Sequence, residues 1–223
     1  YPFLHIITDF LTNYRTQDFF DRSLQIAENY PLKVLNILMN PLGTHDTERI
    51  LTYLAGPVHD GRGRQWQASQ KLSDDEYKKV ISLLKIASAM QFTLPGVPSI
   101  YYGDEAGMEG YRDPFNRACY PWGQENESLI KWYQFLGQLR KICPALKDGR
   151  FIPISAALGC ISYARQTGSD ELIIIANRNE HDIDYYLHEE YFSIEPIYGC
   201  TSHGPYVNVP AMTCALLGRG KWM

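Results

Sequence analysis

The chain is organised around one stretch, Met39-Asn40-Pro41-Leu42-Gly43-Thr44-His45-Asp46-Thr47-Glu48-Arg49. The apolar run at residues 32–38 before it predicts a buried strand, which the proline at Asn40-Pro41 should end because it removes a backbone donor. His45 and Asp46 follow a glycine directly after this strand. Polar groups at the carboxyl end of a buried parallel strand are where α/β barrels carry their chemistry. These two residues are therefore candidate site residues.

Two structural explanations of the same residues stay open at this point. Asp46 or Thr44 could cap the helix expected over residues 47–54, since both residue types are common helix N-caps. His45 and Asp46 could also form a satisfied structural pair rather than a functional one.

Local signals predict the other elements of the first two-thirds of the chain. An amphipathic helix is expected over residues 18–30, stopped by Pro31, and another over residues 128–143. Ser73 and Glu76 have the spacing of a capping box, which should open a helix that ends before Pro95. A short buried strand is expected over residues 99–102, with loops over 56–71 and 108–126.

The sequence pattern changes from helical to β-like near residue 148, where we place a domain boundary. Beyond it the chain has short β-like runs separated by glycine-containing turns, typical of a small antiparallel β-domain. The runs are residues 161–164, 171–177, 183–187, 193–197, 206–209 and 213–217.

Composition excludes several classes of partner. The 223 residues are 45% hydrophobic and 21% charged, as in ordinary globular proteins, and the net charge of -4 argues against a nucleic-acid partner. No apolar run approaches the roughly 20 residues that a membrane span needs. The chain begins with Tyr1 rather than Met, so we expect a piece of a longer protein. The five cysteines are scattered without metal-site spacing, which favours reduced packing residues in a cytoplasmic protein.

Three motifs carry a resemblance to a known family. Gly43-Thr44-His45-Asp46-Thr47-Glu48-Arg49 is similar to the last short motif of the α-amylase family of glycoside hydrolases. Residues 96–107 resemble that family's eighth barrel strand and its exit loop. Asp113-Pro114-Phe115-Asn116-Arg117 with Pro121-Trp122 resembles the following loop of neopullulanase- and cyclomaltodextrinase-like members. The order and spacing of the three motifs agree, and the resemblance covers about residues 1–218.

The resemblance implies a fold of the α/β plus all-β class. Residues 1–148 would be the last part of a (β/α)8 TIM barrel, about strands 7 and 8 with their helices. Residues 149–223 would be a small antiparallel β-sandwich domain.

The resemblance also implies roles for single residues. Asp46 would be the carboxylate that stabilises the cation-like transition state, and His45 would donate a hydrogen bond to the same sugar. Asp113 and Arg117 would grip the sugar one unit beyond the cleaved bond, although a local salt bridge explains them equally well. Tyr120 could stack on a sugar face; it and Trp122 could instead fill the space beneath the loop.

The nucleophile and the general acid that retaining glycosidases require are not found in the chain. It lacks the family's Gly-x-Arg-x-Asp motif, and the resemblance implies a supporting role for Glu105. We therefore expect a fragment of a retaining α-glucan-acting hydrolase, inactive alone, with an α-glucan or maltooligosaccharide substrate. Its partners would be the missing amino-terminal part or further copies of itself. A non-catalytic α-amylase-like protein and a carbohydrate-binding module are the alternatives. No cofactor is expected, and no Asp/Asn-rich loop marks a Ca²⁺ site.

Overall fold

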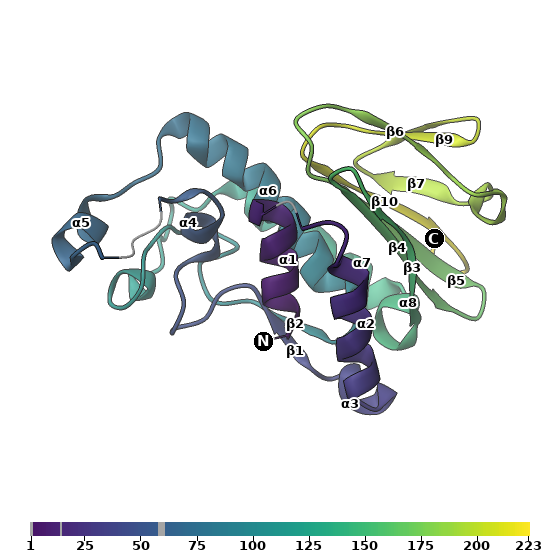
Figure 1. Ribbon diagram of the computed structural model, residues 1–223, viewed down its shortest axis with the longest axis horizontal. Coiled ribbons are helices and arrows are strands. Elements are labelled where there is room, and N and C mark those ends of the chain that lie inside the picture. The colour runs from purple at the N-terminus through teal and green to yellow at the C-terminus, as the bar shows by residue number, and fades with distance from the viewer. Residues whose placement is uncertain (1, 14, 58–60) are drawn as a thin grey trace.

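The computed structural model describes residues 2–13, 15–57 and 61–223. Helices dominate as far as residue 148, and antiparallel sheets follow (Figure 1). The helices are α1 (Pro2–Asn13), α2 (Phe19–Asn29), α3 (Leu32–Leu35), α4 (Ile50–Ala55), α5 (Arg64–Ser69), α6 (Asp74–Thr93), α7 (Glu127–Ile142) and α8 (Ala145–Asp148), with short 3-10 turns η1 (Phe115–Arg117) and η2 (Glu189–Tyr191).

Two short parallel strands position the candidate site. β1 (Met39–Pro41) pairs with β2 (Val97–Ser99), so the loops that follow them leave the pair at the same edge. The Gln91 side chain on α6 donates hydrogen bonds to the carbonyl oxygens of Asn40 (2.7 Å) and Ser99 (3.0 Å). One buried side chain therefore fixes both strands to α6.

The prediction of a buried strand over residues 32–38 is wrong. Leu32–Leu35 form one helical turn, in which the backbone N–H groups of Val34 and Leu35 donate to the Pro31 carbonyl. The strand is confined to Met39–Pro41, and Ile37 is 70% exposed. No described strand pairs with residues 32–37, and only the carbonyl of Leu38 accepts a hydrogen bond from β2, donated by the Val97 N–H at 2.7 Å. The strand predicted over residues 99–102 is also displaced, because β2 ends at Ser99 and the chain then turns away.

The central helix is α6, which contacts α1, α4, α7 and the sheet beyond them. Its N-terminus has the predicted capping box: Glu76 N donates to Ser73 Oγ, and Ser73 N donates to the Glu76 carboxylate at 2.9 Å. The helices predicted over residues 18–30 and 128–143 are also confirmed. The loop predicted over residues 56–71 contains α5, and its residues 58–60 lie outside the described part of the chain.

The last third of the chain forms two antiparallel sheets packed face to face. One has the strand order β3-β4-β5-β10-β7 and the other β6-β9-β8. All the predicted runs lie in or beside strands, whereas β3 and β8 were not predicted. The strands are β3 (Arg150–Ala157), β4 (Cys160–Thr167), β5 (Asp170–Asn177), β6 (Ile183–Tyr186), β7 (Glu195–Tyr198), β8 (Thr201–His203), β9 (Tyr206–Val209) and β10 (Thr213–Arg219).

A second core, including Ile173, Val207 and Leu217, lies in this β-sandwich. The larger sheet turns its other face to the helices, where Tyr163 and Ile174 join the same core as Leu84 and Met90 of α6. Polar contacts cross this junction too. Tyr163 Oη and Thr93 Oγ1 lie 2.6 Å apart, and Arg165 donates to the Thr93 carbonyl at 2.7 Å. One core therefore joins the helices to the larger sheet, and the second core lies between the two sheets of the sandwich.

Candidate functional site

The loop after β1 is a tight turn that exposes His45 and Asp46. The Thr44 N–H donates to Thr47 Oγ1 at 3.0 Å, and the Asp46 N–H donates to Thr44 Oγ1 at 3.2 Å. His45 Nε2 lies 3.3 Å from Asp46 Oδ2, and the two side chains are 65% and 70% exposed. The turn thus presents an imidazole and a carboxylate to solvent at its tip.

Neither Thr44 nor Asp46 caps a helix, so that alternative is wrong. The next helix, α4, begins at Ile50, and its N-cap residue is Arg49 without a side-chain capping bond. Thr44 instead closes the turn that carries Asp46. His45 and Asp46 contact each other, as a structural pair would, and both side chains are also exposed to a ligand.

A second loop, within residues 108–126, binds the backbone of this turn. The buried Asn116 side chain donates to the carbonyl oxygens of His45 (2.9 Å) and Thr47 (2.6 Å). Arg117 also donates to the His45 carbonyl, from Nε at 3.3 Å and from Nη2 at 3.2 Å. Asn116 was not singled out from the sequence, although it lies between the candidate residues of the same motif. Its role depends on a contact with a loop 71 residues away.

Arg117 also forms an ion pair with Asp113, with Nε 3.2 Å from Oδ1. Both side chains are about half exposed. The predicted pair therefore exists as a local salt bridge, and it lies beside the His45 carbonyl. Both charged groups therefore remain accessible from solvent.

The interior support of the two loops is a buried arginine. Arg49 is fully buried, and its guanidinium lies 4.4 Å and 4.6 Å from the ring centres of Tyr101 and Tyr102. It donates to the Tyr102 carbonyl and lies 3.4 Å from Asp104 Oδ1. Burial raises the pKa of Asp104 to about 7, although the Arg49 charge acts to lower it.

The Asp104 carboxylate packs directly on the backbone of the first loop. A Cβ added at Gly43 would lie 2.6 Å from Asp104 Oδ2, so only glycine allows this approach. The neighbouring Glu105 carboxylate accepts a hydrogen bond from the Gly103 N–H at 2.8 Å, which agrees with a supporting role. Arg49 and Asp104 lie in two separate sequence motifs, and nothing in the spacing of these motifs indicated that the two side chains pair.

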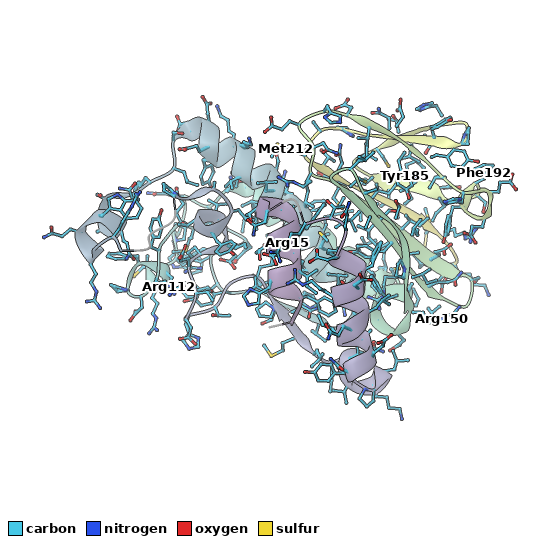
Figure 2. All side chains as sticks on the ribbon, viewed as in Figure 1. Arg15, Arg112, Arg150, Tyr185, Phe192 and Met212 are labelled. Atoms are coloured by element: carbon cyan, nitrogen blue, oxygen red, sulfur yellow. The ribbon has the colours of Figure 1, made fainter. Side chains whose placement is uncertain are left out.

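A hollow of about 140 Å³ opens beside Asp46. His5, Tyr53 and Arg112 line it as well, and Arg112 Nε lies 3.8 Å from Glu48 Oε1. Figure 2 shows Arg112 on the part of the molecule away from the sandwich. Asp46 therefore lies at the edge of a small depression whose lining combines charged groups with apolar side chains such as Leu4 and Ile50.

Trp122, in the loop that contains Asn116, is on the surface, and Tyr120 is partly exposed. The rings of Tyr120 and Trp122 are 4.6 Å apart, and Trp122 is 83% exposed. Trp122 is thus not filler beneath the loop. Tyr102 Oη donates to the Ala118 carbonyl at 2.9 Å, which attaches this segment to the end of β2.

Other groups in the described residues do not add to this site. No cluster of three or more His, Cys, Asp or Glu side chains among them could hold a metal ion. In residues 2–13, 15–57 and 61–223, no helix is both long and apolar enough to cross a membrane. All five cysteines are free thiols; three are buried, whereas Cys119 is exposed and so is not a packing residue.

The sequence of the chain is similar to those of several known glycosidases. No family model matches the chain. An amylopullulanase from Thermoanaerobacter thermohydrosulfuricus is 42% identical over 128 residues, which are 57% of this chain and 8% of that protein. A cyclomaltodextrinase from Geobacillus thermopakistaniensis is 34% identical over 166 residues, which are 73% of this chain and 24% of that protein. The chain thus spans a quarter or less of these two curated relatives.

Solved structures show the same fold. A structure named cyclomaltodextrinase matches 98% of this chain and 36% of its own, with a TM-score of 0.76 at 24% identity. A debranching enzyme from Nostoc punctiforme matches 98% of this chain and 44% of its own, with a TM-score of 0.73 at 23% identity. These relatives and structures are α-amylase family glycoside hydrolases, and the chain matches a carboxyl-terminal portion of them.

Proposed function

We propose that this chain is the part of a retaining α-glucan glycosidase that carries the transition-state-stabilising carboxylate and a sugar-binding loop. The observation that carries the proposal is the exposed Asp46 at the tip of a turn, held from beneath by Asn116 and Arg117. The nucleophile and general acid would come from polypeptide outside these residues. This mechanism uses carboxylates and needs no cofactor.

Each exposed group has a defined task in this proposal. The Asp46 carboxylate accepts hydrogen bonds from hydroxyls of the sugar at the cleaved bond, and its charge opposes the positive charge that develops there. His45 donates a hydrogen bond to the same sugar. Asp113 and Arg117 bind hydroxyls of the next sugar, and the Tyr120 ring packs on a sugar face.

The two parallel strands would be the last two strands of a (β/α)8 barrel within residues 1–148. In support, apolar side chains around the β1–β2 pair are exposed, including Met39 (60%), Val97 (42%) and Ile100 (43%). Further strands of a barrel would cover such side chains. Where no further strands cover these apolar side chains, they would promote association with the missing part of the barrel or between copies of the chain.

The test compares the chain alone with the chain supplied with a polypeptide that carries the nucleophile and the acid. Maltooligosaccharides, a cyclodextrin and an aryl α-glucoside are the substrates. We expect no turnover by the chain alone and turnover by the assembly. In the assembly, Asp46→Asn should lower kcat by orders of magnitude, because a charge acting mainly in the transition state is lost.

The matched control is Asp75→Asn, which removes a carboxylate that is 97% exposed on α6 and should leave kcat unchanged. An Asp46→Asn assembly that keeps more than about a tenth of the original kcat would contradict the role, since that loss is only ~1.4 kcal/mol. Turnover by the chain alone, removed by Asp46→Asn, would show that it contains its own nucleophile and acid.

A further inference from the structure

The outward face of the small sheet β6-β9-β8 carries a row of exposed rings. The register places Tyr186 of β6 opposite Tyr206 of β9, and Tyr206 opposite His203 of β8. The ring centres of Tyr186 and Tyr206 are 5.6 Å apart, and His203 stacks on Tyr206 at 6.0 Å. The two tyrosines are 46% and 42% exposed. Three rings are thus in contact across the whole sheet, with His203 stacked on Tyr206 and Tyr206 packed edge to face against Tyr186.

The row continues beyond the edge of the sheet. The Phe192 ring, 51% exposed, lies 6.5 Å from Tyr186, and the His188 ring lies 5.9 Å from it. Polar groups accompany the rings on the same face. Asn208 Nδ2 donates to Asp184 Oδ1 at 3.0 Å. Each of these residues lies two positions along its strand from a tyrosine of the row, and therefore on the same face.

His188 also lines a hollow of about 320 Å³ at the end of the sandwich. Three opposed residues on β4, β5 and β10 line this hollow: Gln166, Glu171 and Arg219. Glu171 is 1% exposed, and its Oε2 lies 2.7 Å from Arg219 Nη2. At this end, the inner face of the larger sheet therefore carries a row of hydrogen-bonding groups.

Cross-strand ring pairs also stabilise small sheets, and that explains part of this arrangement. It does not explain why Phe192, which is outside every strand, extends the row while remaining half exposed. The charge on the face narrows the choice of ligand. Strands β6, β8 and β9 contain no Lys or Arg, and Asp184 lies 3.9 Å from His203. A nearly neutral face suits a neutral ligand and disfavours nucleic acid and anionic lipid.

We infer that this face, defined by Tyr186, His188, Phe192, His203 and Tyr206, binds a segment of a neutral α-glucan chain. The C–H faces of the sugar rings pack on the aromatic row, and the hydroxyls at their rims bond to Asp184, Asn208 and the groups lining the hollow. Figure 2 places Phe192 at the end of the molecule opposite Arg112, so this site is separate from Asp46. The choice of an α-glucan rests on the function proposed above.

The test is calorimetric titration of the full chain with maltoheptaose, in an Arg117→Ala background that weakens binding at the Asp46 site. We expect Tyr206→Ala and Phe192→Ala each to weaken binding at least about tenfold, because each removes a stacking surface. Tyr206→Phe keeps the ring and should keep the affinity. The matched control is Tyr30→Ala, which removes a tyrosine of similar exposure (38%) from the end of α2.

Phe192→Ala changes a residue outside the strand ladders, so it remains informative if Tyr206→Ala does not fold. Three results would overturn the inference. The first is unchanged maltoheptaose affinity in the folded alanine variants, and the second is no binding of maltoheptaose by their parent. The third is a dimer in sedimentation that Phe192→Ala dissociates, which would make the face a contact between copies. No hydrolysis is measured here, so failure of this site is distinguishable from failure of the Asp46 assignment.

Discussion

Arg117 connects two loops, because its guanidinium contacts both the His45 carbonyl oxygen and the Asp113 carboxylate. In an active assembly, Arg117→Ala should raise KM for longer oligosaccharides more than for a short aryl α-glucoside, since the proposed contact is one sugar beyond the cleaved bond. Asn116 still holds the His45 carbonyl in this variant, so the turn should survive. An equal loss on both substrates, measured by steady-state kinetics, would mean that Arg117 acts only through the turn.

Asp104 should make stability depend on pH. Its folded-state pKa is raised to about 7 by burial, whereas an unfolded Asp titrates near 4. The folded chain therefore binds more protons between about pH 4 and pH 7, and this carboxyl's contribution to the free energy of unfolding falls as the pH rises through that window. Asp104→Asn should remove that fall.

Denaturant unfolding at a series of pH values measures the effect. Asp75→Asn, at an exposed carboxylate, is the control and should keep the slope of the parent. Identical slopes in the parent and Asp104→Asn would contradict the burial argument.

Single residues also mark the limit of what the sequence could predict. His45 and Asp46 were found because they are adjacent in a motif. Arg49 and Asp104 lie 55 residues apart, and Asn116 acts on a carbonyl 71 residues away. Local spacing contains no information on such contacts, which arise only when β1 and β2 pair.

At the scale of elements, the capping box of α6 gives a quantitative prediction. Ser73→Ala removes the acceptor for the Glu76 N–H and should lower the free energy of unfolding by about 1 kcal/mol. Urea unfolding measures the change. Ser128→Ala is the matched control, because Ser128 lies within the first turn of α7 rather than at its N-cap, Asn126. An equal loss in both variants would mean that the cap contributes nothing specific.

Elements with local signals were predicted well for the same reason. The capping box and the helices over 18–30 and 128–143 depend on residues within a few positions of one another. The run at 32–38 is different, because strand or helix depends there on whether a neighbouring strand is present. Pro31 starts a helical turn, and the apolar side chains remain partly outside the core.

At the scale of the whole molecule, the change of pattern near residue 148 corresponds to the start of β3 at Arg150. The sequence predicted two kinds of structure but not how they join. The join depends on Tyr163 and Arg165 of β4, a strand buried on both faces, and nothing in its sequence indicates what covers the face that carries these two residues. Burial lowers the pKa of the Arg165 guanidinium to about 10. Its hydrogen bonds to the carbonyls of Thr93 and Gly149 offset part of the free energy lost when this charge leaves water.

This junction makes folding a single event for both parts. If the sandwich unfolded, the Thr93 carbonyl and the apolar face of α6 would lose their partners. If α6 unfolded, the buried Arg165 guanidinium would lose its hydrogen bond to Thr93. Heating should therefore give one transition, with tryptophan fluorescence and the β-sheet circular dichroism changing at the same temperature. Amide protons of α6 and β4 should exchange with solvent at similar slow rates, because only global opening exposes them. Two separate melting steps would show instead that the sandwich unfolds on its own.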